Sequence, residues 1–141
     1  MILVNPSAKV NKEIPNLQLA YIGTISNSKI IDLNTRPETA DRFLDYQTDV
    51  LATSVQSRTY GQAEKIAKLY KEKYPNSQVV SVSGIIDIEC CYPFLKLKED
   101  LSFSQAFDDN LPFPNYELFD SFEIFKKHWQ IGDWPYAIMT S

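Results

Sequence analysis

The sequence predicts an α/β fold: a Rossmann-like or flavodoxin-like three-layer αβα domain with a mainly parallel sheet of four to five strands. Two observations predict it. Short apolar runs alternate with helical stretches over residues 2–83, and strands that are apolar on both faces are typical of a parallel sheet covered by helices. The length of 141 residues suits one domain with a sizeable core.

The apolar runs are expected to be strands at residues 2–4, 30–33, 50–55 and 78–83. Helices are expected at 16–26, 37–46 and 59–74. In the first helix, the apolar residues at helical spacing are Leu17, Ala20, Tyr21 and Ile25. In the second helix, Phe43 and Leu44 are expected to make the apolar contacts.

The third helix has the clearest two-sided pattern. Its apolar face consists of Tyr60, Ala63, Ile66, Ala67, Tyr70 and Tyr74. Glu64 and Lys68 form an i,i+4 pair on the other face.

Domain boundaries follow the change in composition along the chain. Residues 1–99 are expected to form the α/β domain, in which a fifth strand at 88–97 would be an edge strand or broken because of Pro93. Residues 100–133 are rich in aromatic residues and proline. This segment is expected to be a connector that packs by its rings rather than by regular structure.

Composition excludes several classes of protein. The net charge is −4 and no basic run is present, so no nucleic-acid partner is expected. No apolar stretch is long enough to span a membrane, and the first residues do not resemble a signal peptide. The two cysteines are the neighbours Cys90 and Cys91, which are expected to be reduced thiols rather than a disulfide framework. We therefore expect a cytoplasmic protein.

Candidate binding residues follow the ends of the strands, because ligands of open parallel sheets bind outside the carboxyl ends of the strands. These residues are Asn5, Pro6, Ser54, Gln56, Thr59, Tyr60, Ser83 and Gly84. Hydroxyl groups and amides at a helix start suit a polar or phosphorylated ligand. The alternative is structural: Ser57 or Arg58 caps a helix, and Ser83-Gly84 turns the chain.

Other motifs are missing. The sequence lacks the glycine motifs of dinucleotide and P-loop nucleotide sites, and it lacks the acidic cluster of response regulators after the first strand. The single histidine, His128, lies among aromatic residues and is expected to be packed or on the surface rather than a metal ligand.

A series of short segments follows a specific order along the chain. These are residues 2–6, 19–23, 31–34, 50–60, 63–71, 79–84, 111–120 and 136–141. In this order they resemble the amino-terminal cobalamin-binding domain of radical S-adenosylmethionine enzymes. The resemblance implies an α/β domain that binds cobalamin and is joined to a radical barrel, whose first strand would start within residues 134–141.

In that family, the strand is followed by a C-x-x-x-C-x-x-C loop that binds a [4Fe–4S] cluster used with S-adenosylmethionine. The chain ends before such a loop, so we expect a piece of a longer protein whose cluster and S-adenosylmethionine belong to the missing part. The resemblance implies a methyltransferase, or an oxidative cyclase similar to the anaerobic magnesium-protoporphyrin monomethyl ester cyclase. The piece alone is not expected to be catalytic.

Two departures from the family pattern bear on the cofactor. Ser83-Gly84 stands where relatives often have two glycines. Around His128, Lys126 and Ile131 stand where the D-x-H-x-x-G motif of other cobalamin proteins has Asp and Gly. The resemblance therefore implies cobalamin bound with no protein histidine on cobalt.

The rival hypothesis is a cofactor-free interaction domain of the same fold that covers the barrel. A flavodoxin-like electron carrier is a third hypothesis. It requires a flavin phosphate loop rich in Ser and Thr, which Asn5-Pro6-Ser7 does not provide.

Overall fold

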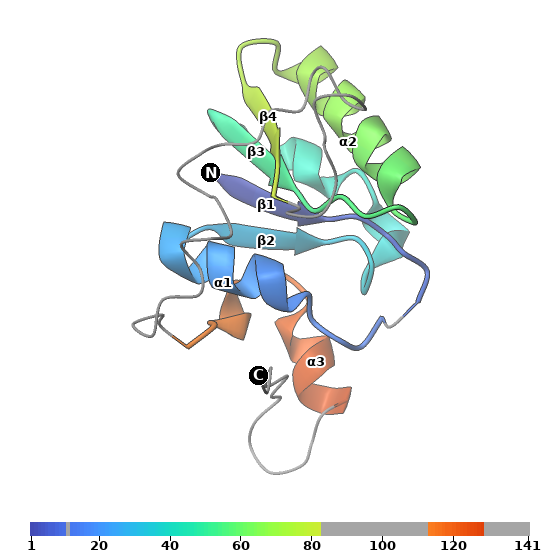
Figure 1. Cartoon of the computed structure of the whole chain (residues 1–141), viewed down its shortest axis with the longest axis vertical. Helices are drawn as coiled ribbons and strands as arrows, with labels where there is room; N and C mark the ends of the chain where they lie inside the picture. Colours follow the sequence, from blue (N-terminus) through green and yellow to red (C-terminus); the bar gives the residue numbers. More distant parts are fainter. Residues whose placement is uncertain (11, 83–112, 129–141) are drawn as a thin grey trace.

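The strands form one parallel sheet in the computed structural model, which describes residues 1–10, 12–82 and 113–128. The strands are β1 (Ile2–Asn5), β2 (Lys29–Asp32), β3 (Val50–Thr53) and β4 (Gln78–Ser81). Their order is β2-β1-β3-β4 (Figure 1). All three pairings are parallel. This confirms the α/β class, and the strand order agrees with a flavodoxin-like fold.

Helices cover both faces of the sheet. They are α1 (Leu17–Ser26), α2 (Tyr60–Lys73) and α3 (Phe122–His128). On one face, α2 packs on β1, β2, β3 and β4 and buries Ala63, Ile66, Ala67 and Tyr70. On the other face, α1 and Phe125 of α3 pack on the same strands. The predicted three layers are therefore present, and alternate residues of each strand belong to the two cores.

The apolar face predicted for α2 is confirmed. Its four central residues are buried, while Tyr60 and Tyr74 are half-buried against the same core. The expected Glu64–Lys68 pair forms with 2.9 Å between Oε1 and Nζ.

The apolar face predicted for α1 is partly wrong. Ile25 is 52% exposed, whereas Leu19, Ile22 and Gly23 are buried with Ala20. Gly23 explains the rotation of the helix, because a Cβ added there would come within 2.9 Å of Ile30 Cδ1 and 3.2 Å of Ser28 O. The glycine thus lets α1 approach β2 closely.

The helix predicted at 37–46 is wrong. Two short 3-10 helices, Pro37–Thr39 and Arg42–Asp45, stand in its place. The Arg42 guanidinium accounts for the interruption, because its Nη1 donates to the carbonyl oxygens of Arg36 and Thr39 at 2.6 and 2.9 Å. Phe43 is nevertheless buried and Leu44 half-buried in the α2-side core, as predicted.

Part of the predicted connector packs on the sheet. Phe119 forms an isolated parallel β-bridge with Ile30 of β2, and the Asp120 N–H donates to the Ile30 carbonyl at 2.9 Å. The rings of Tyr116, Phe119 and Phe125 lie in the α1-side core. The segment also contains regular structure that the sequence did not predict, a 3-10 helix at Tyr116–Leu118 and α3.

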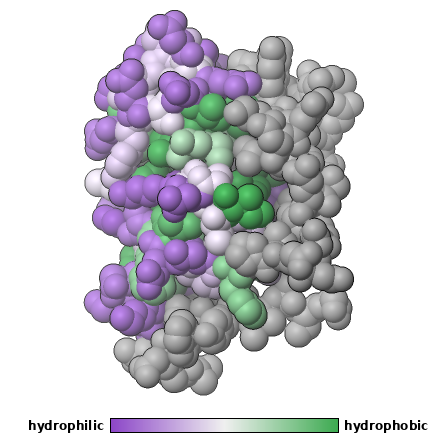
Figure 2. Space-filling view, turned by 90° about the vertical axis from the view of Figure 1, so that its left-hand side faces the viewer, coloured by the Kyte–Doolittle hydropathy of each residue, from purple (hydrophilic) through white to green (hydrophobic). Residues whose placement is uncertain are grey.

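Figure 2 shows the face from which β1 and β2 start, the left side of Figure 1. Hydrophilic side chains cover much of its described surface, and hydrophobic ones gather near the centre of the view. In the described part of the chain, no helix is long and apolar enough to cross a membrane. The possible strand at 88–97, the Cys90-Cys91 pair and residues 134–141 lie outside the described residues.

Candidate functional site

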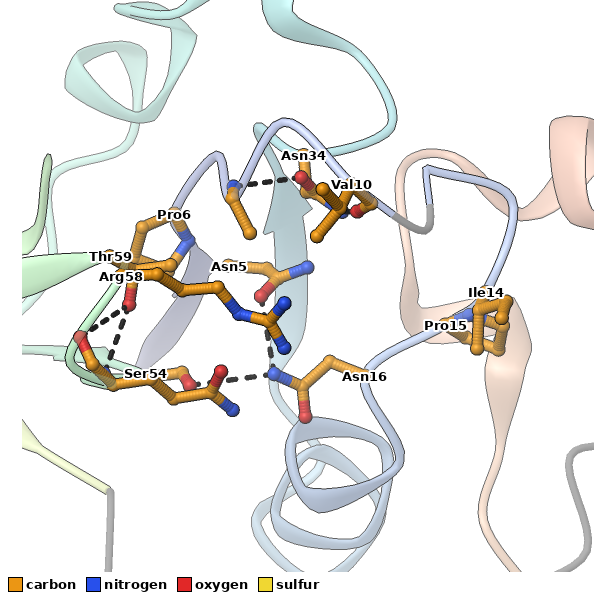
Figure 3. A pocket seen from close by; sticks show the side chains of 12 residues that line it. Asn5, Pro6, Val10, Ile14, Pro15, Asn16, Asn34, Ser54, Arg58 and Thr59 are labelled. Carbon is orange, nitrogen blue, oxygen red and sulfur yellow. Dashed lines mark hydrogen bonds between the residues drawn. The ribbon is translucent and has the colours of Figure 1, made fainter.

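A pocket lies at the carboxyl ends of β1 and β3 (Figure 3). These strands are neighbours in the sheet, and β1 pairs with β2 on its other side, so the pocket lies where the strand order reverses. The cavity has a volume of about 270 Å³. Its lining residues come from the loops after the first three strands. They are Asn5, Pro6, Ala8, Val10, Ile14, Pro15, Asn16, Asn34, Ser54, Gln56, Arg58 and Thr59.

Asn16 ties two sides of the pocket together. It is the N-cap of α1, and its Oδ1 accepts a hydrogen bond from the Leu19 N–H at 3.2 Å. Because that backbone group can only donate, the Asn16 amide nitrogen faces the other way. Its Nδ2 donates to Asn5 Oδ1 at 3.2 Å and to Ser54 Oγ at 3.4 Å. The start of α1 is thereby joined to the ends of β1 and β3.

Asn34 holds the loop that follows β1. Its Oδ1 accepts a hydrogen bond from the Ala8 N–H at 2.8 Å, and its Nδ2 donates to the Val10 carbonyl at 2.9 Å. Asn34 is itself buried. Val10 and Ile14 on this loop are 43% and 44% exposed, so the pocket has an apolar border beside its polar interior.

The loop after β3 supplies hydroxyl and guanidinium groups. Thr59 is the N-cap residue of α2, but its side chain makes no capping hydrogen bond. Its Oγ1 instead accepts from the Gln56 N–H at 3.0 Å. The structural alternative that placed the cap at Ser57 or Arg58 is therefore wrong. Arg58 is the only charged residue among the described lining residues, and its side chain points over the pocket toward Asn5 and Asn16 (Figure 3).

A buried carboxylate lies behind the pocket wall. Asp32, at the end of β2, is 0% exposed. Its Oδ1 accepts from Asn5 Nδ2 at 2.8 Å and from the N–H groups of Asn34 and Thr35 at 3.1 and 3.3 Å. Its Oδ2 accepts from Ser121 Oγ at 2.8 Å. Because a carboxylate only accepts, it fixes the orientation of the Asn5 amide.

The structure brings together five of the eight residues that the sequence singled out. Asn5, Pro6, Ser54, Gln56 and Thr59 line the pocket. Tyr60 does not line it and packs with the α2-side core. Ser83 and Gly84 lie outside the described residues.

Sequence reasoning missed the other lining residues. Two of them carried a readable signal: Asn16 is the first residue of a predicted helix, and Asn34 directly follows a predicted strand. Arg58 was considered only as a helix cap. Ala8, Val10, Ile14 and Pro15 carried no signal, because their positions depend on the path of the loop after β1.

Among the described residues, the groups with shifted pKa values lie away from the pocket. Burial raises the pKa of Tyr116 to about 12, with a smaller contribution from Tyr21. Burial also raises the pKa of Tyr70, whose hydroxyl donates to the Tyr46 carbonyl at 2.8 Å. The pKa of the exposed Glu38 carboxyl is lowered, mainly by a backbone hydrogen bond.

The pocket offers amide, hydroxyl and guanidinium groups, the kinds of polar group that fix the orientation of ligands in small-molecule sites. Among the described residues, no group of three or more His, Cys, Asp and Glu side chains could hold a metal ion. His128 is an exposed residue of α3.

Comparisons with protein-family models, curated proteins and solved structures find no match for this chain.

Proposed function

We propose that this chain is a cobalamin-binding-like domain of a radical S-adenosylmethionine enzyme. In this proposal it positions cobalamin, with no protein histidine on cobalt, for a methyl transfer or an oxidative cyclisation. The observation that carries the proposal is the pocket at the β1/β3 switch point, because cofactors of doubly wound folds bind at such points. The sequence resemblance supplies the identity of the cofactor.

The pocket residues suit one part of such a ligand. A volume of about 270 Å³ is just below the usual ~300–1,000 Å³ of small-molecule sites, so the pocket would receive a portion of cobalamin and not the whole molecule. Asn5, Ser54 and Arg58 offer hydrogen bonds to amide and phosphate oxygens, whereas both amide N–H groups of Asn16 already donate within the pocket wall.

The cofactor and the protein have different roles in this proposal. When bound, cobalamin supplies a cobalt centre that carries a methyl group or an electron, and the protein supplies position and exclusion of water. Asn16, through Asn5 and Ser54, keeps the wall of the pocket in one arrangement. The iron–sulfur cluster and S-adenosylmethionine belong, in this proposal, to a barrel outside this chain. A cytoplasmic location is part of the same proposal.

The second candidate is a cofactor-free domain that covers the barrel. The exposed side chains of Val10 and Ile14 favour it, because apolar residues at a pocket border are suited to contact with another domain. It differs from the first candidate in what the isolated chain binds, since only the first predicts affinity for a corrinoid.

Hydroxocobalamin distinguishes the two candidates. The purified chain is mixed with it, its visible spectrum is recorded, and retention of the corrinoid on gel filtration is measured. Cobalamin binding predicts a spectral change and co-elution of the corrinoid with the protein. An unchanged spectrum together with free corrinoid on the column would support the cofactor-free domain.

A matched pair of variants locates the binding. Ala8 lines the pocket, whereas Ala40 is exposed and outside the lining. Ala8→Trp is expected to fill the cavity and abolish co-elution, and Ala40→Trp is expected to bind as the unsubstituted chain does. Equal binding by both variants would place the corrinoid elsewhere. Circular dichroism of each variant confirms that the fold is kept.

A further inference from the structure

The pocket wall is connected to the distant segment Phe119–Phe125 by a chain of buried hydrogen bonds. Ser121 Oγ donates to Asp32 Oδ2 at 2.8 Å, and Asn5 Nδ2 donates to Asp32 Oδ1 at 2.8 Å. Ser121 and Asp32 are 1% and 0% exposed, and Asn5 is 8% exposed. We propose that Ser121 is a positioning residue for the pocket, which it reaches through Asp32 and Asn5.

Asp32 depends strongly on its hydrogen-bond donors. A buried carboxylate is costly unless its oxygens are hydrogen-bonded. Within the described residues, no cationic side chain forms an ion pair with this carboxylate. The bond that Arg42 makes to Asp32 goes to the backbone oxygen, at 2.7 Å, and not to the side chain. Three donors serve Oδ1, whereas Ser121 is the donor found on Oδ2. Loss of that hydroxyl therefore leaves Asp32 Oδ2 without a donor from the described residues, which favours rotation of the carboxylate.

Rotation of the Asp32 carboxylate would change the position of the Asn5 amide, which lines the pocket. The Asn5 amide donates to Asp32 with Nδ2 and accepts from Asn16 with Oδ1. Asn16 in turn donates to Ser54 Oγ. Each amide in this series has only one orientation that satisfies its partners, so the hydrogen-bonding pattern of the wall is set from behind the pocket.

Ser121 is itself held firmly. Asp120 forms an ion pair with Arg42, with 2.6 Å between Oδ2 and Nε, and its Oδ1 accepts from the Asp32 N–H at 2.9 Å. Phe119 and Phe125 are buried in the α1-side core. Docking of this segment and ligand binding in the pocket are therefore coupled, and such coupling is reciprocal.

The test compares two serine-to-alanine variants that each lose one buried hydroxyl. Ser121→Ala removes the bond to Asp32. Ser77→Ala is the matched control, because Ser77 is 7% exposed and its Oγ donates to the Thr48 carbonyl, outside the pocket lining. Ser121→Thr is the conservative variant that keeps a hydroxyl group.

The first readout needs no ligand. The side-chain amide signals of Asn5 are identified in a ¹H–¹⁵N NMR spectrum by their loss in Asn5→Ala. Ser121→Ala is expected to shift these signals and speed their hydrogen exchange. Ser77→Ala and Ser121→Thr are expected to show the Asn5 signals at the positions they have in the unsubstituted chain. Unchanged Asn5 signals in Ser121→Ala would overturn the inference, whether or not the chain binds cobalamin.

The second readout rests on the proposed function. Ser121→Ala is expected to weaken hydroxocobalamin binding about fivefold, the effect of one net hydrogen bond, while Ser77→Ala binds as the unsubstituted chain does. Equal affinities for both variants would contradict the coupling. If the unsubstituted chain does not bind hydroxocobalamin, the proposed function fails and the NMR comparison alone decides the inference.

Discussion

Removal of the Asp120 carboxylate should destabilise the fold strongly, because this residue anchors the Phe119–Phe125 segment. Its Oδ2 lies 2.6 Å from Arg42 Nε and its Oδ1 lies 3.3 Å from Arg42 Nη2. The Arg42 side chain is 13% exposed and the Asp120 side chain is 11% exposed. Asp120 Oδ1 also accepts the hydrogen bond of the Asp32 N–H at 2.9 Å. Asp120→Ala therefore leaves a guanidinium and a backbone N–H without these partners.

The expected magnitude follows from the partners that remain. Breaking a buried ion pair costs about 3–5 kcal/mol, and an unsatisfied buried N–H costs about 1–3 kcal/mol. Arg42 still donates to the carbonyl oxygens of Arg36, Thr39 and Asp32, which reduces the first cost. We expect Asp120→Ala to lower the free energy of unfolding by about 3 kcal/mol, and Asp120→Asn by less, because the amide keeps an acceptor for the Asp32 N–H.

Equilibrium unfolding in urea, followed by circular dichroism, measures this change. The control is Glu38→Ala, which removes an exposed ion pair with Arg36 whose side chains are 37% and 62% exposed. A much smaller loss of stability is expected there, because the ion pair and the backbone hydrogen bond of the Glu38 carboxyl are exposed to solvent. If Asp120→Ala and Glu38→Ala unfold at the same urea concentration, the segment is not docked on β2 in solution and the reasoning is refuted.

Three further predictions concern single side chains, and urea unfolding measures all of them. Gly23→Ala should destabilise the fold by about 1 kcal/mol, because its Cβ would come within 3.2 Å of the backbone oxygen of Ser28 and 2.9 Å of Cδ1 of the buried Ile30; unchanged stability would show that α1 can move away from β2. Gly61→Ala should stabilise the fold by about 0.5 kcal/mol, since a Cβ there has no neighbour within 4 Å and alanine favours the helix; a loss of stability would contradict this. Burial raises the pKa of Tyr116 to about 12, so the stability that this residue contributes is present below pH 10 and is lost as the pH rises from 10 to about 12. Tyr116→Phe should therefore lose less stability than the unsubstituted chain over that interval, by about 2–3 kcal/mol at most, and parallel losses would show that Tyr116 ionises normally.

The sheet and α2 could be predicted because their sequence patterns are local. Four apolar runs and one clear helical period are enough to specify parallel strands and the face of α2. Where a tertiary contact decided the structure, local patterns failed. Ile25 has the helical spacing of a core residue, but the close approach of Gly23 to Ile30 turns it outward. The 37–46 segment is broken by Arg42, whose partners include Asp120 far along the chain.

The same distinction applies to the pocket. The rule that ligands bind at the carboxyl ends of parallel strands selected Asn5 and Ser54 correctly as neighbours. The loop after β1 could not be placed from sequence, because Asn34 holds it from another strand. The buried bond between Asp32 and Ser121 joins residues 89 positions apart, and no local pattern signals it.

The most direct test of the pocket is a ¹H–¹⁵N NMR titration of the chain with hydroxocobalamin. Binding at the switch point predicts that the largest shifts occur in the backbone amides of Ser7, Ser54 and Gln56, which follow β1 and β3, while Lys29 and Gln78, at the starts of β2 and β4, change little. The absence of any shift at saturating hydroxocobalamin, or shifts concentrated at Lys29 and Gln78, would contradict a cobalamin site at the carboxyl ends of the strands.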